Sequence, residues 1–169
     1  DGAKRALYRI KRDPKNNKLA VEPEMLLKGF SHVGGIDISE DMLFLGVATG
    51  ERKNSIGHIL QIPITFFNEN ESLSVSEKMN LLEQDSSIQK HPLNDAPKPN
   101  GVVFDARTEG AFYTYEHMVR GITKGENGNI GSTKSGKIRD FITPNGLALE
   151  PFTSEPILYA SLLWKNEII

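Results

Sequence analysis

The sequence predicts an all-β fold and, within that class, a β-propeller. Short segments rich in β-branched and aromatic residues recur along the chain, separated by turn-forming stretches such as "DPKNNK", "TGERKNS" and "KGENGN". Such a pattern is typical of a sandwich, a barrel or a propeller, and no long amphipathic helix interrupts it. An internal repeat of about the length of one blade favours the propeller among these three.

The repeat starts at residues 32, 98 and 143, with the same order of features in each copy. A glycine comes first, followed by an alternating apolar strand, a polar turn and a second strand around an aromatic residue. The glycines are Gly35, Gly101 and Gly146, and the aromatic residues are Phe44, Tyr113 and Tyr159. The step of 45 residues from 101 to 146 matches a four-stranded blade of about 40–45 residues. The step of 66 residues from 35 to 101 indicates an insertion near "FFNENESLSVSEK".

The expected strands follow one another along the chain, with one ambiguous segment. Residues 73–83, "LSVSEKMNLLE", fit one or two helical turns and an outer strand equally well. A glycine that opens each innermost strand has a physical reason, because these strands crowd around a central axis where a Cβ atom does not fit. The expected strands are "ALYRIKR", "HVGGIDIS", "MLFLGVAT", "GHILQIPITFF", "GVVFDA", "AFYTYEHM", "NGLALEP" and "ILYASLLW".

The repeat divides the chain into blade segments of roughly 1–31, 32–97, 98–142 and 143–169, within one partial propeller domain. We expect about three blades, whereas propellers typically have 4–8. The first and last segments resemble parts of blades, and the apolar strand "ILYASLL" would be an aggregation hazard if its edge were unpaired. We therefore expect further polypeptide, or a second chain, to complete the propeller.

Composition excludes several classes of function. The 20 Lys and Arg residues against 22 Asp and Glu residues give a net charge of −2, which gives no indication of a nucleic-acid partner. No apolar run approaches the ~18 residues that span a bilayer, so we expect a soluble protein. The absence of cysteine excludes disulfides, zinc–thiolate sites and thiol catalysis. It leaves the compartment open, secretion included, because secreted proteins can also lack cysteine.

Two asparagines occupy the same place in the repeat, one residue before the glycine. They are Asn100 and Asn145, each within a Pro-Asn-Gly tripeptide, and the first copy has Gly34 at this place. If the innermost strands surround one axis, both carboxamides converge at the mouth of the central channel. Amide oxygens suit Ca²⁺, which takes 6–8 oxygen ligands. The alternative is that Asn-Gly only forms the turn ahead of a strand.

The segments "PNGVVFDARTEGAFYTYEH" and "GKIRDFITPNGLALEPFTSEPILYASLLWKNEI" resemble consecutive blades of the six-bladed calcium-dependent lactonases. That superfamily includes the paraoxonases and the gluconolactonase/senescence-marker-protein group. The resemblance covers residues 97–168 and implies a calcium ion in the central channel, with Asn100 and Asn145 among its ligands. The acidic ligands of the family have no counterpart in this chain.

The segment "FYTYEH" is similar to a paraoxonase segment that ends in Asp-His. The resemblance implies that His117, with Glu116 before it, is a proton-transfer group. The alternative, which the residues themselves favour, is that His117 is only a hydrogen-bonded residue at the end of a strand. The other channel histidine of the paraoxonases has no clear counterpart, and His91 and His32 are the candidates for it.

Two functions follow from these observations. The first is calcium-dependent hydrolysis of a lactone or ester, in which the ion polarises the carbonyl and a nearby His or carboxylate activates water. The second is a non-catalytic propeller that serves as a binding or interaction scaffold, or an incomplete part of a lactonase-like protein. The fold alone does not decide between them, because propellers carry many functions.

Overall fold

The computed structural model describes residues 5–11, 15–16, 18, 23–51, 54–94, 96–106, 110–115, 118–124, 130–137, 142–150 and 157–164. Within these ranges the chain forms twelve strands and two short helices. The prediction of an all-β fold is confirmed. Neither of the described helices is long and apolar enough to cross a membrane.

Two sheets are four-stranded antiparallel meanders in which each strand pairs with the next along the chain. The first consists of β3 (His32–Ser39), β4 (Met42–Thr49), β5 (Ile56–Pro63) and β6 (Gln89–Leu93). The second consists of β7 (Gly101–Asp105), β8 (Gly110–Tyr115), β9 (Met118–Lys124) and β10 (Ile130–Lys137).

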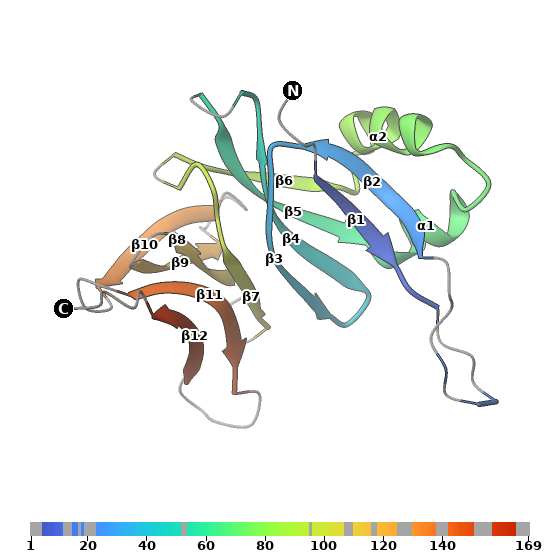
Figure 1. Cartoon of the computed structure of the whole chain (residues 1–169). Coiled ribbons are helices and arrows are strands. Elements are labelled where there is room, and N and C mark those ends of the chain that lie inside the picture. The colour runs from blue at the N-terminus through green and yellow to red at the C-terminus, as the bar shows by residue number, and fades with distance from the viewer. Residues whose placement is uncertain are drawn as a thin grey trace.

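Two further sheets have two antiparallel strands each in the described part of the chain. One pairs β1 (Arg5–Arg9) with β2 (Glu24–Phe30), immediately before the first meander. The other pairs β11 (Ile142–Leu149) with β12 (Leu158–Trp164), after the second meander. Figure 1 shows β7 between β3 and β11, so the first strands of three successive sheets lie side by side.

The contact between β3 and β7 requires glycine. A Cβ atom on Gly34 would overlap the carbonyl oxygen of Pro99, and one on Gly35 would overlap the backbone nitrogen of Val102 and lie 2.6 Å from the Cα of Gly101. Backbone atoms cannot rotate out of the way as a side chain can. The close approach that the sequence predicts for the first strand of a blade is therefore present at Gly35.

Side chains fill the space between the two meanders outside this backbone contact. Phe44 of β4 stacks on Phe104 of β7 with ring centroids 4.2 Å apart and an interplanar angle of 12°. Val102 and Tyr113 are almost completely buried in the same cluster. A second cluster lies between the β1–β2 hairpin and the first meander, where Leu27 and Leu45 are fully buried.

The insertion between β5 and β6 is helical, and this resolves the ambiguity of residues 73–83. It contains α1 (Ile64–Glu69) and α2 (Val75–Gln84). The hydroxyl of Ser74 accepts a hydrogen bond from the backbone of Glu77, whose carboxylate accepts one from the backbone of Ser74, forming a capping box. This pairing satisfies backbone donors at the start of the helix and favours a helix over an outer strand.

The strand expected from "GHILQIPITFF" is too long, because β5 ends at Pro63 and α1 begins at the next residue. Phe66 and Phe67 of α1 are buried and meet edge to face, so the apolar run serves a helix that packs on the core. The sequence pattern does not predict β2, β6, β9 and β10 as separate strands. Pairing with a neighbouring strand stabilises such segments in spite of weak intrinsic propensity.

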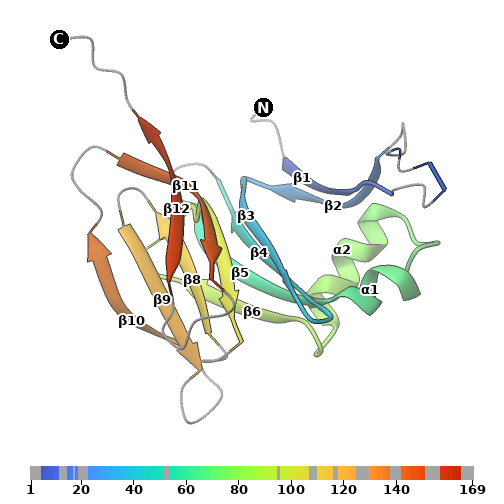
Figure 2. The same ribbon diagram turned by 90° about the horizontal axis from the view of Figure 1, so that it is seen from below.

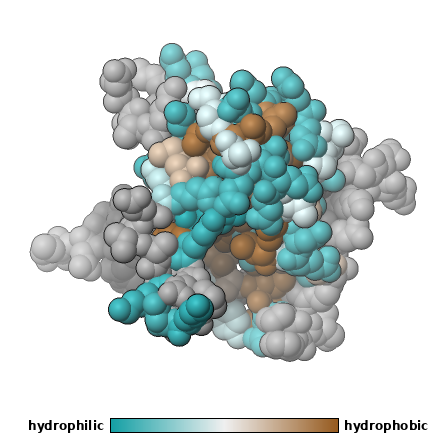
Figure 3. Space-filling model, turned by 90° about the vertical axis from the view of Figure 1, so that its right-hand side faces the viewer, coloured by the Kyte–Doolittle hydropathy of each residue, from teal (hydrophilic) through white to brown (hydrophobic). Residues whose placement is uncertain are grey.

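An ionic network joins the β1–β2 hairpin to the helical insertion. The guanidinium of Arg9 donates to Glu24 at 2.8 Å and 3.0 Å and to Asn68 at 3.0 Å. Glu24 also pairs at 3.6 Å with the ammonium of Lys78, a buried residue of α2. Figure 2 shows both helices beside the hairpin, and Figure 3 shows hydrophilic residues dividing the apolar surface of this side into patches. The network fixes α2 against β2.

The first prediction concerns the β3–β7 contact. We expect Gly35→Ala to lower the free energy of unfolding by about 1–3 kcal/mol or more, because the methyl group overlaps backbone atoms of β7. Chemical denaturation of the variant and of the wild type, followed by circular dichroism, measures the difference.

Gly46→Ala is the matched control, because its Cβ would meet a side-chain atom, Cγ2 of Val102, at 2.7 Å. Truncating the Val102 side chain makes room for the new methyl group. The double variant Gly46→Ala/Val102→Ala should therefore lose less unfolding free energy than the sum of the losses in the two single variants. Val102→Ala should not rescue Gly35→Ala. Equal rescue of both variants would show that the β3–β7 backbones are not in close contact.

Candidate functional site

The candidate site lies at the end of the molecule where β7 begins, with Asn100 at its centre. The backbone N–H of Asn100 donates to the carbonyl oxygen of Thr114 at 2.8 Å. The next N–H, of Gly101, donates to the Thr114 hydroxyl at 2.8 Å, and Thr114 is fully buried. These two bonds fix the backbone on which the half-buried Asn100 side chain stands.

His32, the first residue of β3, lies beside Asn100. Its Nε2 is 3.1 Å from the carbonyl oxygen of Pro99. A carbonyl can only accept, so the hydrogen of the neutral ring resides on Nε2 and Nδ1 carries the lone pair. The structure therefore brings one of the two candidate channel histidines to Asn100. The other, His91, lies in β6 with its Nε2 3.4 Å from Oε1 of Gln61.

Burial lowers the pKa of His32, and the positive charges of Arg5 and Lys98 lower it further. Its contacts with the Pro99 carbonyl and the Asn100 side chain act in the opposite direction. The lowered pKa favours the neutral imidazole at neutral pH. Arg5 and Lys98 therefore place two positive charges near His32 and Asn100.

Two of the three equivalent positions of the repeat, Gly34 and Asn145, lie at an irregularity in strand pairing. Pairing of β3 with β4 shifts register between Val33 and Ile36, which places Gly34 at the shift. Pairing of β11 with β12 shifts between Pro144 and Gly146, which places Asn145 at the shift. In the second copy, Asn100 directly precedes the first pair of β7 with β8. Such irregularities re-aim side chains and are frequent next to functional sites.

The remaining predicted site residues lie partly outside the described residues. Nothing is described for Glu116 and His117, and of Asn145 only the backbone is described, as part of β11. Gly101 pairs with Thr114, so β8 ends at the same end of its sheet as Asn100. Tyr115, the last residue of β8, pairs with Met118, the first residue of β9.

The described residues around Asn100 do not complete a calcium site. They offer neutral oxygens, the Asn100 amide and the Pro99 carbonyl, the latter in contact with His32. The nearby charges that act on His32, on Arg5 and Lys98, are positive. Nowhere in the described part of the chain do three His, Asp or Glu residues gather closely enough to hold a metal ion. A calcium ion at this end would need further oxygen ligands, because Ca²⁺ takes 6–8 of them.

A pocket that sequence reasoning missed lies toward the other end of β3, β7 and β11. It has a volume of about 370 Å³, and residues from all three strands line it, including Asp37, Ser39, Asp105 and Leu149. Ser39 and Asp105 follow the repeat glycines by four residues, roughly 13 Å along a strand. The sequence feature that could have indicated this pocket is a polar residue within an otherwise apolar strand.

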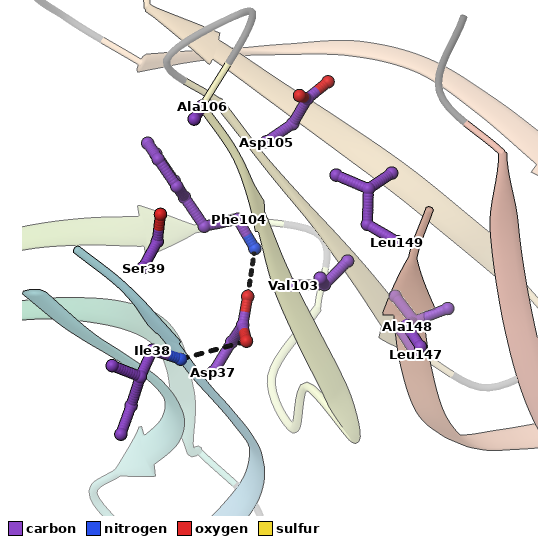
Figure 4. A pocket seen from close by; sticks show the side chains of 10 residues that line it. All are labelled: Asp37, Ile38, Ser39, Val103, Phe104, Asp105, Ala106, Leu147, Ala148 and Leu149. Carbon is purple, nitrogen blue, oxygen red and sulfur yellow. Dashed lines mark hydrogen bonds between the residues drawn. The ribbon is translucent and has the colours of Figure 1, made fainter. Parts of the chain in front are cut away.

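The carboxylate of Asp37 joins the two strands in this pocket. Its Oδ2 accepts a hydrogen bond from the backbone N–H of Phe104 at 2.8 Å, and its Oδ1 accepts one from Ile38 at 2.9 Å. Figure 4 shows this carboxylate directed at β7, whereas that of Asp105 points away from it. The two acidic groups do not form one site, and Asp37 serves to hold β3 against β7.

No family model, curated protein or solved structure matches this chain.

The second prediction concerns His32. Its pKa is lowered in the folded state, so the unfolded chain binds a proton more readily, and stability should fall as pH drops through about 6.5. His58 and His91, whose pKa values burial also lowers, contribute with the same sign. His32→Gln keeps an N–H donor for the Pro99 carbonyl and removes one group that titrates in this pH range.

We therefore expect the loss of unfolding free energy between about pH 7 and about pH 5.5 to be smaller in His32→Gln than in the wild type. Urea denaturation at several pH values measures it. His91→Gln is the matched control. It should remove the contribution of His91 to the pH dependence of the unfolding free energy and leave that of His32 unchanged. An unchanged slope in His32→Gln would show that His32 is not held neutral beside Pro99.

Proposed function

We propose that the successive sheets are blades of a six-bladed β-propeller, with β3, β7 and β11 as innermost strands. Two consecutive four-stranded meanders and the adjacency of the three first strands support this. The glycine-dependent contact at Gly34 and Gly35 supports it further, because innermost strands approach most closely near a shared axis.

We propose that the end of the channel at Asn100 and Asn145 hydrolyses a lactone or ester with a calcium ion. One observation carries this proposal: the positions Gly34, Asn100 and Asn145, equivalent in the repeat, all coincide with a break in pairing or the start of a strand. The side-chain amide oxygens of Asn100 and Asn145 would be neutral ligands of the ion. When bound, calcium would polarise the substrate carbonyl and stabilise the developing oxyanion.

His117, preceded by Glu116, is the proposed proton-transfer group, and the position of His32 supports a second histidine at the same end. The lowered pKa of His32 favours the neutral ring, which keeps Nδ1 as a proton acceptor while Nε2 donates to Pro99. A positioned imidazole of this kind can take a proton from water or pass one on. Glu116 would supply negative charge that the described residues around Asn100 lack.

The second candidate function is a non-catalytic scaffold, and the charges around Asn100 favour it. Arg5 and Lys98 lie close enough to His32 to lower its pKa, and neither suits a bound cation. In this alternative, Asn100 and Asn145 only adapt the backbone at the start of a strand. The end of the channel would then present neutral and basic groups to a partner.

The third prediction separates these two functions by calcium-dependent stability. If the site binds calcium, a free concentration 100 times the Kd stabilises the fold by about 2.7 kcal/mol, which raises the Tm by about 5–10 °C in a chain of this size. Asn100→Ala and Asn145→Ala should each reduce that increase. Asn100→Asp should retain it, because it keeps an oxygen and adds negative charge.

Differential scanning calorimetry with calcium, with magnesium and with a chelator measures the effect. The scaffold predicts a different pattern, in which the alanine variants lower the Tm equally with and without calcium. A wild-type Tm that does not respond to calcium would remove the support for the calcium-dependent enzyme.

The fourth prediction concerns His117. Against a panel of lactones and aryl esters, His117→Gln should lower kcat by about 10²–10⁴-fold, the usual contribution of a general acid or base. The calcium-induced rise in Tm should remain, because the imidazole is not a proposed ligand. His58→Gln, on β5, is the control and should leave kcat unchanged. Equal activity of His117→Gln and the wild type would exclude His117 as the proton-transfer group.

A further inference from the structure

The pocket between β3, β7 and β11 is large enough for a small molecule. Its volume of about 370 Å³ lies within the range of ligand pockets, roughly 300–1,000 Å³. A water molecule takes up about 30 Å³ in the liquid, so the pocket has room for about a dozen water-sized groups. A ligand of about 10 non-hydrogen atoms therefore fits.

The walls of the pocket are mainly apolar. β7 is the last strand of its sheet, so one of its edges is not paired within that sheet. Figure 4 shows Phe104 on one side of β7 and Leu147 and Leu149 on the other, and all three line the pocket. These side chains are only half buried. An apolar ligand that covers them removes this surface from water, which contributes to its binding free energy.

One carboxylate in this pocket has no cationic partner among the described residues. Oδ1 and Oδ2 of Asp37 accept hydrogen bonds from the backbone N–H groups of Ile38 and Phe104, at 2.9 Å and 2.8 Å. Both donors are neutral, and none of the ion pairs in the described part of the chain involves Asp37. Each oxygen of a carboxylate has a second lone pair. Asp37 is therefore held in place by two bonds and can still accept further ones.

The charges of the lining have one sign. The described residues that line the pocket include Asp37 and Asp105 and no Lys, Arg or His. Apolar walls lower the local dielectric constant, which strengthens the attraction between a carboxylate and a cation. An organic cation suits the pocket better than a metal ion, because no three His, Asp or Glu residues in the described ranges gather closely enough to hold a metal.

We propose that this pocket binds a small organic cation, an ammonium group attached to a compact apolar body. The ammonium group donates to the remaining lone pairs of Asp37, and the apolar body lies against Phe104, Leu147 and Leu149. The hydroxyl of Ser39, which also lines the pocket, can accept one further N–H. The pocket lies toward the opposite end of the strands from Asn100, so this inference does not rest on the proposed function.

Two matched probes test the requirement for a positive charge. Phenethylamine is a cation at neutral pH, and phenethyl alcohol has the same apolar body with a neutral hydroxyl in place of the ammonium group. An NMR chemical-shift titration of the whole chain should give a Kd about tenfold or more lower for phenethylamine, because hydrogen bonds to charged groups are the stronger ones. The anion hydrocinnamate should bind more weakly than either.

Asp37→Asn is the test variant, because it removes the charge and keeps an amide oxygen that can accept the N–H of Phe104. It should raise the Kd of phenethylamine about tenfold or more and leave that of phenethyl alcohol unchanged. Glu69→Gln is the matched control, because it removes one negative charge from an exposed residue of α1. It should leave both Kd values unchanged.

A second variant keeps the test decisive if Asp37→Asn does not fold. Ala148 of β11 lines the pocket and is exposed, so a larger side chain there displaces no buried atoms. Ala148→Trp should fill part of the pocket and weaken the binding of both probes. Circular dichroism of each variant checks that its fold is retained.

Several results would overturn the proposal. They are the absence of phenethylamine binding at millimolar concentration, equal Kd values for the two probes, and tighter binding of hydrocinnamate. Equal losses of phenethylamine binding in Asp37→Asn and Glu69→Gln, or unchanged binding in Ala148→Trp, would also overturn it. A Tm that does not respond to calcium concerns the Asn100 end alone and leaves a positive result for this pocket unaffected.

Discussion

The close approach of the β3 and β7 backbones is the constraint on which the rest of the structure depends. Gly34 and Gly35 allow it, since a Cβ atom on either would overlap backbone atoms between Pro99 and Val102. This contact sets the two meanders face to face, so Phe44 can stack on Phe104 and Asp37 can accept the N–H of Phe104. It also places His32 beside Asn100. One steric requirement thus determines the packing between sheets and the composition of the candidate site.

The sequence predicts the repeated part of the fold better than its insertion. The glycine at the head of each repeat, followed by alternating apolar residues, identified β3, β7 and β11 as equivalent strands. The helical insertion was harder, because the run "ITFF" has the β-branched and aromatic composition of a strand. Burial of Phe66 and Phe67 against the core, a tertiary effect, makes it helical. The capping box of Ser74 and Glu77 was the local signal that could have identified α2.

The candidate site was predictable only where it follows the repeat. Asn100 emerges from the sequence because it shares a position with Asn145, and the breaks in strand pairing at Gly34 and Asn145 follow the same register. The proximity of His32 to Asn100 depends on how two sheets pack, and the spacing of 68 residues in the sequence carries no such information. The role of Asp37 was missed for the same reason. Its hydrogen-bond partner, Phe104, lies on another sheet.

A crystal structure of the protein grown with calcium tests the central claim most directly. We expect β3, β7 and β11 to surround one axis and the amide oxygens of Asn100 and Asn145 both to lie about 2.3–2.6 Å from a single ion at one end of it. An ion bound instead beside Asp37 and Asp105, or Asn100 and Asn145 directed at separate places, would contradict it.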